Sequence, residues 1–536
     1  MRRSGARVVL DKSQPRYASG AQITVRRPDL RTRARATLFL RNPGFEDAFK
    51  KWSSHRSRLV ALDWEQIERD FGVSPHYFAD VERYALRYHL EVDRKRKRPA
   101  ECTVSLTGKL EDFGRAFGIE FVEVEGYVDL RVRRYRSHLG PILLPPRLSR
   151  VIEAVLGLDR SDPFRSHTLK PLVRKARVDP AKVAQQYRFP RDVDGTGETI
   201  AVILLGGDVP LDDIRAYFRH RGQRVPSIEI VRVEGHHDQM GQAEEIRAMV
   251  RQLVTKDDPW RELNDSQMRA LRTLEAAVDL ELLGTFAPGA KLVVYIARPT
   301  FHGKFEAFSR AIHDRRRDVS VICCCWGAQE DLVPPAVCCA FDRLFRIAAL
   351  RGITICCSSG DDGGMGGVQF PASSPHVLAC GGTYWEPGRR QRREEAWAWS
   401  GGGFSKVFEP GKWQARDVKA YRPHTKWRGV PDVAARANLQ NEGYELVAGG
   451  CLVPMGGTSV AAPLWAGLVA LLNQKLGARL GFLAPQLYRT QRELAFRKPL
   501  YDVSRGYSYG YEARSGWDAC TGLGSPNGEG LLAALR

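Results

Sequence analysis

One serine of this sequence stands where it could act as a nucleophile. Ser459 lies in "GGTSVAAPLWAGLVALLN", where small residues lead into a long apolar run. This pattern predicts a buried helix that begins at the serine, and a helix start offers free N–H groups and the positive end of the helix dipole. A serine hydroxyl is a weak nucleophile until a base takes its proton. The alternative is a serine that only caps a buried helix.

No histidine of the chain has a setting that suits the role of this base. The motif around Ser459 resembles the nucleophile motif of the subtilisin-like fold, which would also require an aspartate after an early strand and a histidine on a helix. The chain has 12 histidines, but none of them, including His236, His237 and His302, has a glycine-framed helical setting. The base must therefore be a residue of another type.

Two carboxylates are the candidates for the base. Glu275 and Asp279 are four residues apart in "LEAAVDLELL", so a helix would place both on one face. Three apolar side chains near the same face predict that it meets the core: Leu274, Val278 and Leu282. Two carboxylates in a dry site cannot both ionise easily, and such a pair can work as a base at acid pH. The alternative is an exposed helix with ordinary acidic residues, including Glu281.

Four short apolar segments predict the scaffold for these residues. The segments are "GETIAVILLGG", "AKLVVYIA", "DVSVICCCWG" and "GITICCSSGDDGG". They are apolar throughout and alternate with helical stretches, which indicates a parallel sheet covered on both faces. Ligands in such sheets bind beyond the carboxyl ends of the strands, so the glycine-rich strand ends are the place to expect chemistry.

The first third of the chain predicts a separate, smaller unit. Residues 1–40 are basic without a helical or strand period, which predicts a flexible leader. Residues 41–165 predict an α+β unit, with two helices in "WEQIERDFGVSPHYFADVERYALRYHLEV" and then a strand, a helix and a hairpin. Residues 166–180 are polar and rich in proline and basic residues, which predicts a linker to the larger domain at 181–536.

Composition places the chain among globular proteins. It has 536 residues, of which 43% are hydrophobic and 27% charged. Its apolar runs fall short of the ~20 residues that a bilayer span needs, so we expect no membrane partner. The net charge of +20 keeps a nucleic-acid-binding protein as one alternative. Its densest basic cluster, "DRKRKR" at 93–98, is equally explained by a solvated loop, and no nucleic-acid-binding motif accompanies it.

The 11 cysteines predict buried free thiols. Eight of them are neighbours or nearly so: Cys323–Cys325, Cys338, Cys339, Cys356, Cys357 and Cys380. Most lie in apolar strand-like runs. Because there is no C-x-x-C pair and no histidine nearby in the sequence, we expect no zinc site. Buried free thiols are more typical of a protein from a reducing compartment than of a secreted protein cross-linked by disulfides.

Taken together, these segments resemble the sedolisin, or serine-carboxyl peptidase, family, and its kumamolisin-like branch most. The peptidase part carries "EAAVD" followed by "APGA", and then "VICCCWG", "SSGDDG", "FPASSPHVLACGGT", "SGGGFS", "RGVPDVAA" and "GGTSVAAP". "VSLTGKLEDFGRAFG" and "IEAVLGLD" resemble the activation prodomain of the family. The segment "QQYRFPRDVDGTGETIAVILLGG" resembles the start of its catalytic domain. The resemblance thus runs over most of the chain.

The resemblance implies a fold and a set of roles. The fold is a subtilisin-like parallel sheet flanked by helices, preceded by a smaller α+β prodomain. The activity is that of an acid-acting serine endopeptidase made as an autoprocessing proenzyme, with Ser459 as nucleophile, Glu275 as base and Asp279 as its partner. Asp361 takes the oxyanion-hole position, where only a protonated carboxyl can donate a hydrogen bond. The alternative is a catalytically silent homologue that binds peptides or a partner.

The C-terminal segment "YDVSRGYSYGYEARSGWDACTGLGSP" resembles the calcium loop of the family. The resemblance implies one structural Ca²⁺ with oxygen ligands from five residues: Asp502, Val503, Arg514, Gly516 and Asp518. It also implies polypeptide substrates, the prodomain as an intramolecular inhibitor, and an extracellular location. The first 20 residues carry basic side chains but no apolar core, so no signal peptide is visible in them.

Overall fold

The structure is a computed structural model. It describes residues 7–11, 13–15, 26–54, 61–93, 99–128, 131–161, 164–166, 176–236, 240–255, 263–385, 394–437 and 442–536. Two compact units make up the chain. The first has residues 1–163, 299–309 and 331–351, and the second has 164–298, 310–330 and 352–536. Most of the predicted linker and of the basic cluster, together with His237, lies outside the described residues.

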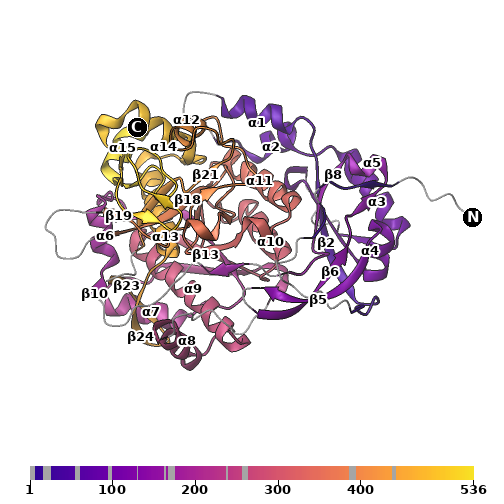
Figure 1. The fold of residues 1–536 in the computed structure, drawn as a ribbon, viewed down its shortest axis with the longest axis horizontal. Coiled ribbons are helices and arrows are strands. Elements are labelled where there is room, and N and C mark those ends of the chain that lie inside the picture. Colours follow the sequence, from indigo (N-terminus) through magenta and orange to yellow (C-terminus); the bar gives the residue numbers. More distant parts are fainter. Residues whose placement is uncertain are drawn as a thin grey trace, which may run out of the picture. The chain divides into compact units, whose positions relative to one another are not determined.

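An eight-stranded sheet is the centre of the second unit (Figure 1). Its strands are β11 (Thr199–Leu205), β12 (Ser227–Arg232), β13 (Lys291–Ala297), β14 (Val321–Cys324), β16 (Thr354–Ser358), β18 (Leu378–Trp385), β19 (Glu394–Ala396) and β22 (Val433–Arg436). They follow the order β12-β13-β11-β14-β16-β18-β19, with β22 also on β18, and only the pair β18–β19 is antiparallel. The four predicted apolar segments form β11, β13, β14 and β16, which confirms the predicted parallel sheet.

Two long helices, α9 (Asp265–Phe286) and α13 (Thr458–Leu476), pack on each other and on this sheet (Figure 1). A capping box begins α9, because the side chains of Asn264 and Gln267 each accept a hydrogen bond from the other's backbone N–H. Gly457 precedes α13 with a φ of 113°, a conformation that glycine adopts at low cost. The other helices of the unit are α6 (Pro180–Gln186), α7 (Leu211–His220), α8 (Ala243–Thr255), α12 (Ala415–Tyr421), α14 (Leu483–Glu493) and α15 (Gly528–Leu535).

Short strands complete the second unit. They are β9 (Arg165–Ser166), β10 (Ala176–Val178), β15 (Trp326–Gln329), β17 (Gln369–Phe370), β20 (Gly403–Phe404), β21 (Gly429–Val430), β23 (Glu442–Ala448), β24 (Cys451–Met455), β25 (Leu500–Tyr501), β26 (Tyr507–Ser508), β27 (Tyr511–Glu512) and β28 (Ser525–Pro526). Strand β9 pairs antiparallel with β15, so the chain enters this unit as an added strand beside the end of β14.

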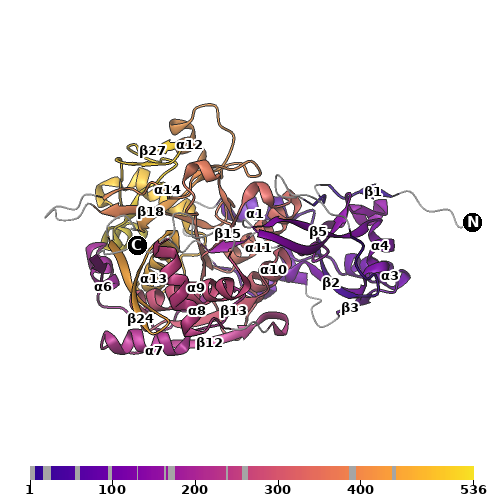
Figure 2. The ribbon, with the colours of Figure 1, turned by 60° about the horizontal axis from the view of Figure 1, so that its bottom comes forward.

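The first unit is built on an antiparallel sheet of order β3-β4-β2-β8 (Figure 2). Its strands are β1 (Val8–Val9), β2 (Arg33–Leu40), β3 (Glu91–Val92), β4 (Thr103–Lys109), β5 (Glu120–Val128), β6 (Arg131–Leu139), β7 (Leu143–Leu144) and β8 (Ile152–Leu156). Its helices are α1 (Phe45–Ser53), α2 (Trp64–Phe71), α3 (Pro75–Arg87), α4 (Leu110–Phe117), α5 (Pro146–Ser149), α10 (Phe301–Ile312, except its last turn) and α11 (Pro335–Leu350). The predicted helix pair is α2 and α3, and the predicted strand, helix and hairpin are β4, α4 and β5–β6.

The expectation of an irregular leader over residues 1–40 is wrong at its end. Strand β2 occupies Arg33–Leu40 and pairs with both β4 and β8 in the middle of the sheet. The first two residues of this strand that point inward are Ala34 and Ala36, and the residues that alternate with them are arginines. Because alanine is a weak strand former and arginine is charged, the alternation of this strand is hard to see in the sequence.

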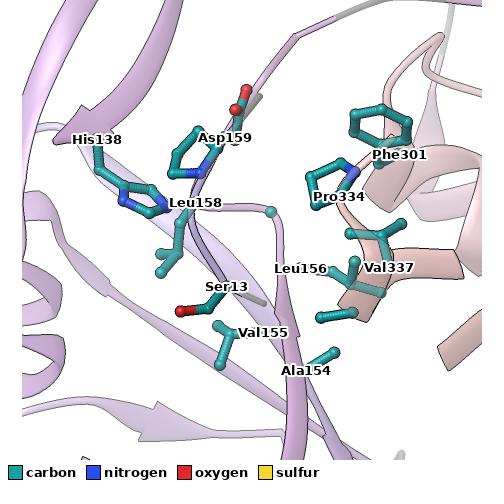
Figure 3. A pocket seen from close by; sticks show the side chains of 13 residues that line it. Ser13, His138, Ala154, Val155, Leu156, Leu158, Asp159, Phe301, Pro334 and Val337 are labelled. Atoms are coloured by element: carbon teal, nitrogen blue, oxygen red, sulfur yellow. The ribbon is translucent and has the colours of Figure 1, made fainter. Parts of the chain in front are cut away.

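A small cavity lies within the first unit (Figure 3). It measures about 40 Å³, and its lining is mostly apolar, with Leu156, Phe301 and Val337 among its walls. His138 and Asp159 supply polar groups at its edge. A volume of this size holds no more than a few water molecules, so it is not a peptide-binding site.

The cysteines agree with a further expectation. All 11 cysteines are free, and nine of them are fully or almost fully buried, whereas Cys339 is partly buried and Cys451 is exposed. The prediction of buried free thiols is therefore confirmed. Among the described helices, none is both long enough and apolar enough to cross a membrane.

Candidate active site

Helix α9 carries Glu275 and Asp279 one turn apart, and both side chains are fully buried. The three apolar residues predicted to share their face are buried as well: Leu274, Val278 and Leu282. Almost the whole helix is enclosed by the protein. The alternative of an exposed helix with ordinary acidic residues is therefore wrong. The reason is that α9 is covered on several sides by α6, α7, α8, α13 and β23 as well as by the sheet.

Glu281 is the acidic residue of α9 whose surroundings differ most from the alternative of an exposed helix. It is fully buried, and its Oε2 accepts a hydrogen bond of 2.9 Å from the N–H of Val447 in β23. Burial raises the pKa of Glu281 well above its ordinary value, and the bond from Val447 only partly opposes this. Glu281 is thus a buried acid that packs against β23, not a surface residue, and its burial favours the protonated form.

Ser459 lies in the first turn of α13, as the sequence predicts, and is fully buried. Its hydroxyl has no hydrogen-bond partner among the described residues. Its backbone carbonyl accepts a hydrogen bond from the Cys325 thiol, with an S···O distance of 3.6 Å. Pro463 lies inside the helix, four residues after Ser459, and has no N–H to donate to the Ser459 carbonyl, so the Cys325 thiol bonds to that carbonyl instead. Among the described residues, the hydroxyl is therefore buried without a hydrogen bond.

Asp361 reaches the start of α13 from the loop that follows β16. Its Oδ1 accepts two hydrogen bonds from Thr458, one of 2.8 Å from the backbone N–H and one of 2.7 Å from the hydroxyl. Its Oδ2 is buried and has no partner among the described residues. Burial raises the pKa of Asp361 well above its ordinary value; the bonds from Thr458 oppose this, and the charges of Asp362 and Glu275 add to it. Asp361 is thus held in place through one oxygen, and burial favours its protonated form.

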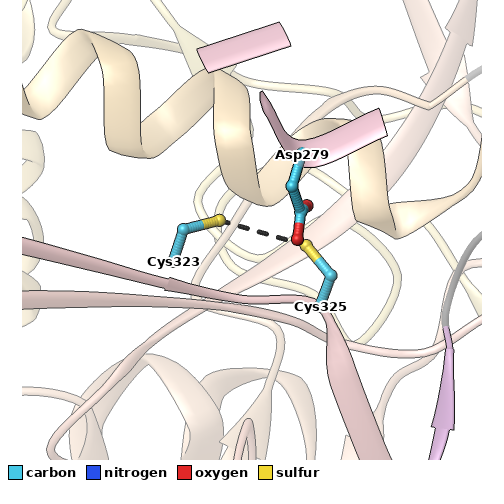
Figure 4. Close-up of side chains that lie close together, drawn as sticks. All are labelled: Asp279, Cys323 and Cys325. Carbon is cyan, nitrogen blue, oxygen red and sulfur yellow. Dashed lines mark hydrogen bonds between the residues drawn. The ribbon is translucent and has the colours of Figure 1, made fainter. Parts of the chain in front are cut away.

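Asp279 faces two thiols, as Figure 4 shows. Cys323 belongs to β14 and Cys325 follows it, and one ligand atom of each of the three residues lies within 4.8 Å of the others. Neither carboxyl oxygen of Asp279 has a hydrogen-bond partner of good geometry among the described residues. Burial raises the pKa of Asp279 to about 8, and the nearby Cys325 thiol has a smaller opposite effect.

The predicted catalytic residues therefore meet in one place: Glu275, Asp279, Asp361 and Ser459. The charge of Glu275 acts on both Asp361 and Cys325, and Cys325 also lies against Asp279 and the backbone of Ser459. Sequence reasoning missed Thr458 and Cys325 as neighbours of these groups. Thr458 had a signal, since threonine at a helix start often bonds nearby polar groups. Cys325 had none, because its neighbours come from α9 and α13.

The predicted calcium ligands lie in one loop. Asp518 is fully buried and accepts hydrogen bonds from the N–H of Arg514 at 2.9 Å and from that of Thr521 at 2.8 Å. Asp502 accepts one of 2.9 Å from the N–H of Gly516, and the carbonyl of Val503 accepts one from the Thr521 hydroxyl. Burial raises the pKa of Asp518 to about 6. Among the described residues no arginine or lysine pairs with either carboxylate, and carboxylate and carbonyl oxygens are the ligands that a hard cation such as Ca²⁺ takes.

Comparisons with known proteins agree with this geometry. Residues 264–489 match the profile of the Subtilase family, and residues 28–161 match that of the Pro-kumamolisin activation domain. Kumamolisin from Bacillus sp. (strain MN-32) is 35% identical over 89% of this chain and 86% of its own length. Tripeptidyl-peptidase 1 from Canis lupus familiaris is 32% identical over 50% of this chain and 53% of its own.

A solved structure has the same fold. It is that of Pseudomonas sedolisin, a serine-carboxyl proteinase complexed with two molecules of pseudo-iodotyrostatin. The match has a TM-score of 0.56 and 25% identity, and it covers 68% of this chain and 99% of that one. These matches make the chain a serine-type peptidase with a subtilisin-like fold. The chain belongs to the sedolisin, or serine-carboxyl peptidase, family, in its kumamolisin-like branch with an activation prodomain.

Proposed function

We propose that this serine-carboxyl peptidase is an acid-acting endopeptidase made as an autoprocessing proenzyme. One observation carries the proposal. Asp361 is held by Thr458 through one oxygen, while its other oxygen is buried and unbonded beside the helix turn that presents Ser459. A neutral carboxyl in this position can donate a hydrogen bond to an oxyanion, and it can do so only while it is protonated.

In the acylation step Glu275 takes the proton of the Ser459 hydroxyl as Oγ attacks the carbonyl carbon of the scissile peptide. The carbonyl π electrons move to the oxygen, and the resulting oxyanion accepts a hydrogen bond from the Asp361 carboxyl. The C–N bond then breaks, and the protonated Glu275 gives its proton to the leaving amine. Water next attacks the acyl-enzyme as Glu275 takes a proton from it, and Ser459 recovers its own. Asp279, one turn away on α9, orients Glu275 throughout.

The backbone of β9 supports the assignment of an endopeptidase that cuts itself. Strand β9 pairs antiparallel with β15 and also contacts α9, the helix that carries Glu275. Peptides are often bound in this way, as a strand added to an exposed edge. The chain continues beyond β9 in both directions, so this edge holds an internal segment of a polypeptide. Such a mode fits cleavage within a chain better than removal of residues from a free end.

Contacts within the first unit support inhibition by the prodomain. Helix α11 comes from the peptidase part of the sequence, and its Arg343 and Arg346 pair with Glu153 at 3.1 Å and Glu46 at 2.7 Å. The Glu46 side chain is exposed, whereas that of Glu153 is only 17% accessible. Acid protonates such glutamates and removes their attraction to arginine. We therefore propose that acid loosens the prodomain and allows cleavage in the linker.

We also propose one structural Ca²⁺ in the C-terminal loop. Carboxylates would come from Asp502 and Asp518, and carbonyls from the remaining three predicted residues: Val503, Arg514 and Gly516. The ion would neutralise two acidic groups that have no cationic side chain beside them among the described residues, and it would tie the loop together.

The test compares wild type with Ser459→Ala at about pH 4 in the presence of Ca²⁺, an acid pH at which the proposal requires Asp361 to be protonated while Glu275 can still accept a proton. Chain length is followed by mass spectrometry and activity by cleavage of a blocked peptide that has no free N-terminus. We expect wild type to lose its prodomain and cut the blocked peptide, and the variant to do neither. An intact and inactive wild type across acid pH would favour the silent, peptide-binding homologue.

A further inference from the structure

We propose that Asp279, Cys323 and Cys325 form a binding site for a thiophilic divalent cation of the Zn²⁺ and Cd²⁺ class, and that the bound cation inhibits the peptidase. The inhibition rests on the role proposed for Asp279, but the binding does not. The site is shown in Figure 4.

The separation of the two sulfurs is the first argument. The Sγ atoms of Cys323 and Cys325 are 3.9 Å apart. Two thiolates on one tetrahedral zinc, each with a Zn–S bond of about 2.3 Å, are about 3.8 Å apart. A disulfide would require a separation of about 2.05 Å. The thiols therefore stand at the distance that a shared metal ion requires and well beyond the distance of a covalent bond.

The third ligand is the second argument. Asp279 comes from α9, is fully buried, and turns toward the two thiols with neither carboxyl oxygen bonded in good geometry among the described residues. A buried polar group without a partner is costly, so its orientation toward two metal-binding atoms is informative. Two thiolates and a carboxylate are ligands that zinc takes, and three protein ligands leave one position open.

The strand geometry explains why two of three consecutive cysteines share this site. Side chains of an extended chain alternate between its faces, so Cys323 and Cys325 point one way and Cys324 the other. In agreement, the Cys324 thiol bonds instead to the carbonyl of Trp326, at an S···O distance of 3.5 Å. The sequence alone predicts no zinc site, because the third ligand comes from a different element.

Binding would convert both thiols to thiolates, since each Cys–SH exchanges its proton for a bond to the metal, and these two protons pass to solvent together with any proton held by Asp279. The bound cation would take the carboxylate of Asp279 as a ligand and withdraw it from Glu275. The expected result is a peptidase that thiophilic cations inhibit.

The test uses Cd²⁺ as the probe, because cadmium–thiolate bonds absorb in the ultraviolet. All variants carry Cys451→Ser, which removes the exposed thiol. Four proteins are titrated as full chains: the background, Cys323→Ser with Cys325→Ser, Asp279→Asn, and the control Cys338→Ser with Cys339→Ser. Those that process themselves in acid are titrated again afterwards. Equilibrium dialysis gives the stoichiometry and the affinity.

We expect the background and control proteins to bind one Cd²⁺ tightly and to show thiolate absorption. The Cys323 and Cys325 variant should lose both the binding and the absorption. Asp279→Asn should keep the absorption but weaken binding by at least the ~10–100-fold that loss of a second-shell partner costs. Unchanged binding in the Cys323 and Cys325 variant would overturn the site, and unchanged affinity in Asp279→Asn would overturn the role of the carboxylate.

The inhibition is measured separately, as the Cd²⁺ concentration that halves the peptidase activity of each protein relative to its own metal-free rate. We expect this inhibitory Cd²⁺ concentration to rise by at least about tenfold only when Cys323 and Cys325 are replaced, because that variant lacks two of the metal ligands. Cd²⁺ binding by a protein without peptidase activity would contradict the proposed function and support the metal site. Peptidase activity without Cd²⁺ binding would support the proposed function and contradict the metal site.

Discussion

Two buried acidic sites of the second unit differ in what surrounds them. Asp432 is fully buried, and so is its partner Arg428, whose Nη2 lies 2.6 Å from Oδ2. The N–H of Ala379 and the hydroxyl of Tyr488 also donate to Asp432, at 2.9 and 3.2 Å. Asp279 is just as buried and has no cation beside it and no hydrogen bond of good geometry among the described residues.

Under the proposed mechanism, this difference separates a structural carboxylate from a reactive one. Burial raises the pKa of Asp432 too, but Arg428 and three hydrogen bonds act against it and satisfy both of its oxygens. At Asp361 one oxygen is fixed and the other is left unbonded. Unsatisfied buried acids cost stability, so they persist where they are used, and this pair of sites shows the distinction within one domain.

The largest expected effect is on catalysis. Glu275→Gln removes the base and keeps the shape of the side chain, so we expect peptidase activity to fall by roughly 10³–10⁴-fold while the protein stays folded. The matched control is Glu281→Gln, the same change on the same helix in a buried acid outside the site. Its activity should stay within about twofold of wild type, because a single peripheral hydrogen bond is at stake. Steady-state kinetics on a blocked peptide, with circular dichroism for folding, checks both.

The next effect is on stability. Arg428→Met leaves Asp432 buried without its cation, and we expect the free energy of unfolding to fall by about 3–5 kcal/mol. Urea unfolding of the Ser459→Ala protein, which cannot digest itself, measures this. Adding Asp432→Asn to Arg428→Met should restore a large part of the loss. If the double variant is no more stable than the single one, the two residues do not act as an ion pair.

A smaller effect concerns calcium. If the C-terminal loop binds Ca²⁺, a concentration of about 100 times the dissociation constant stabilises the fold by about 2.7 kcal/mol. Chelation should therefore lower the melting temperature of Ser459→Ala, and Asp518→Asn should make the melting temperature insensitive to Ca²⁺. A melting temperature that chelation leaves unchanged in the parent protein would count against the proposed ion.

The smallest effect is a change in pH dependence. Asp361 has a folded-state pKa raised above its unfolded value, so the stability it contributes is full at low pH and is lost as the pH rises toward the folded pKa. Asp361→Asn cannot ionise. We expect it to lose about tenfold in activity at the acid optimum, to extend its activity to higher pH, and to lose less stability than wild type between acid and neutral pH. Identical pH profiles would show that Asp361 does not set the alkaline limit.

Much of the fold was open to prediction because the signals are local. The apolar segments at β11, β13, β14 and β16 had to be buried on both faces, and that is how a parallel sheet is made. The spacing of Glu275 and Asp279 placed them on one face of a helix, whatever that helix packed against. Strand β2 escaped prediction because alanine occupies its first inward positions.

The sequence alone thus determined the elements of this protein, the face of α9 that carries two acids, and the helix turn that presents Ser459. Tertiary structure decided which groups meet. It brought Thr458 to Asp361, enclosed Glu281, and set Cys323 and Cys325 against Asp279. The physical reason is that periodicity reports which side of an element avoids water, whereas contacts between distant segments depend on how the whole chain packs.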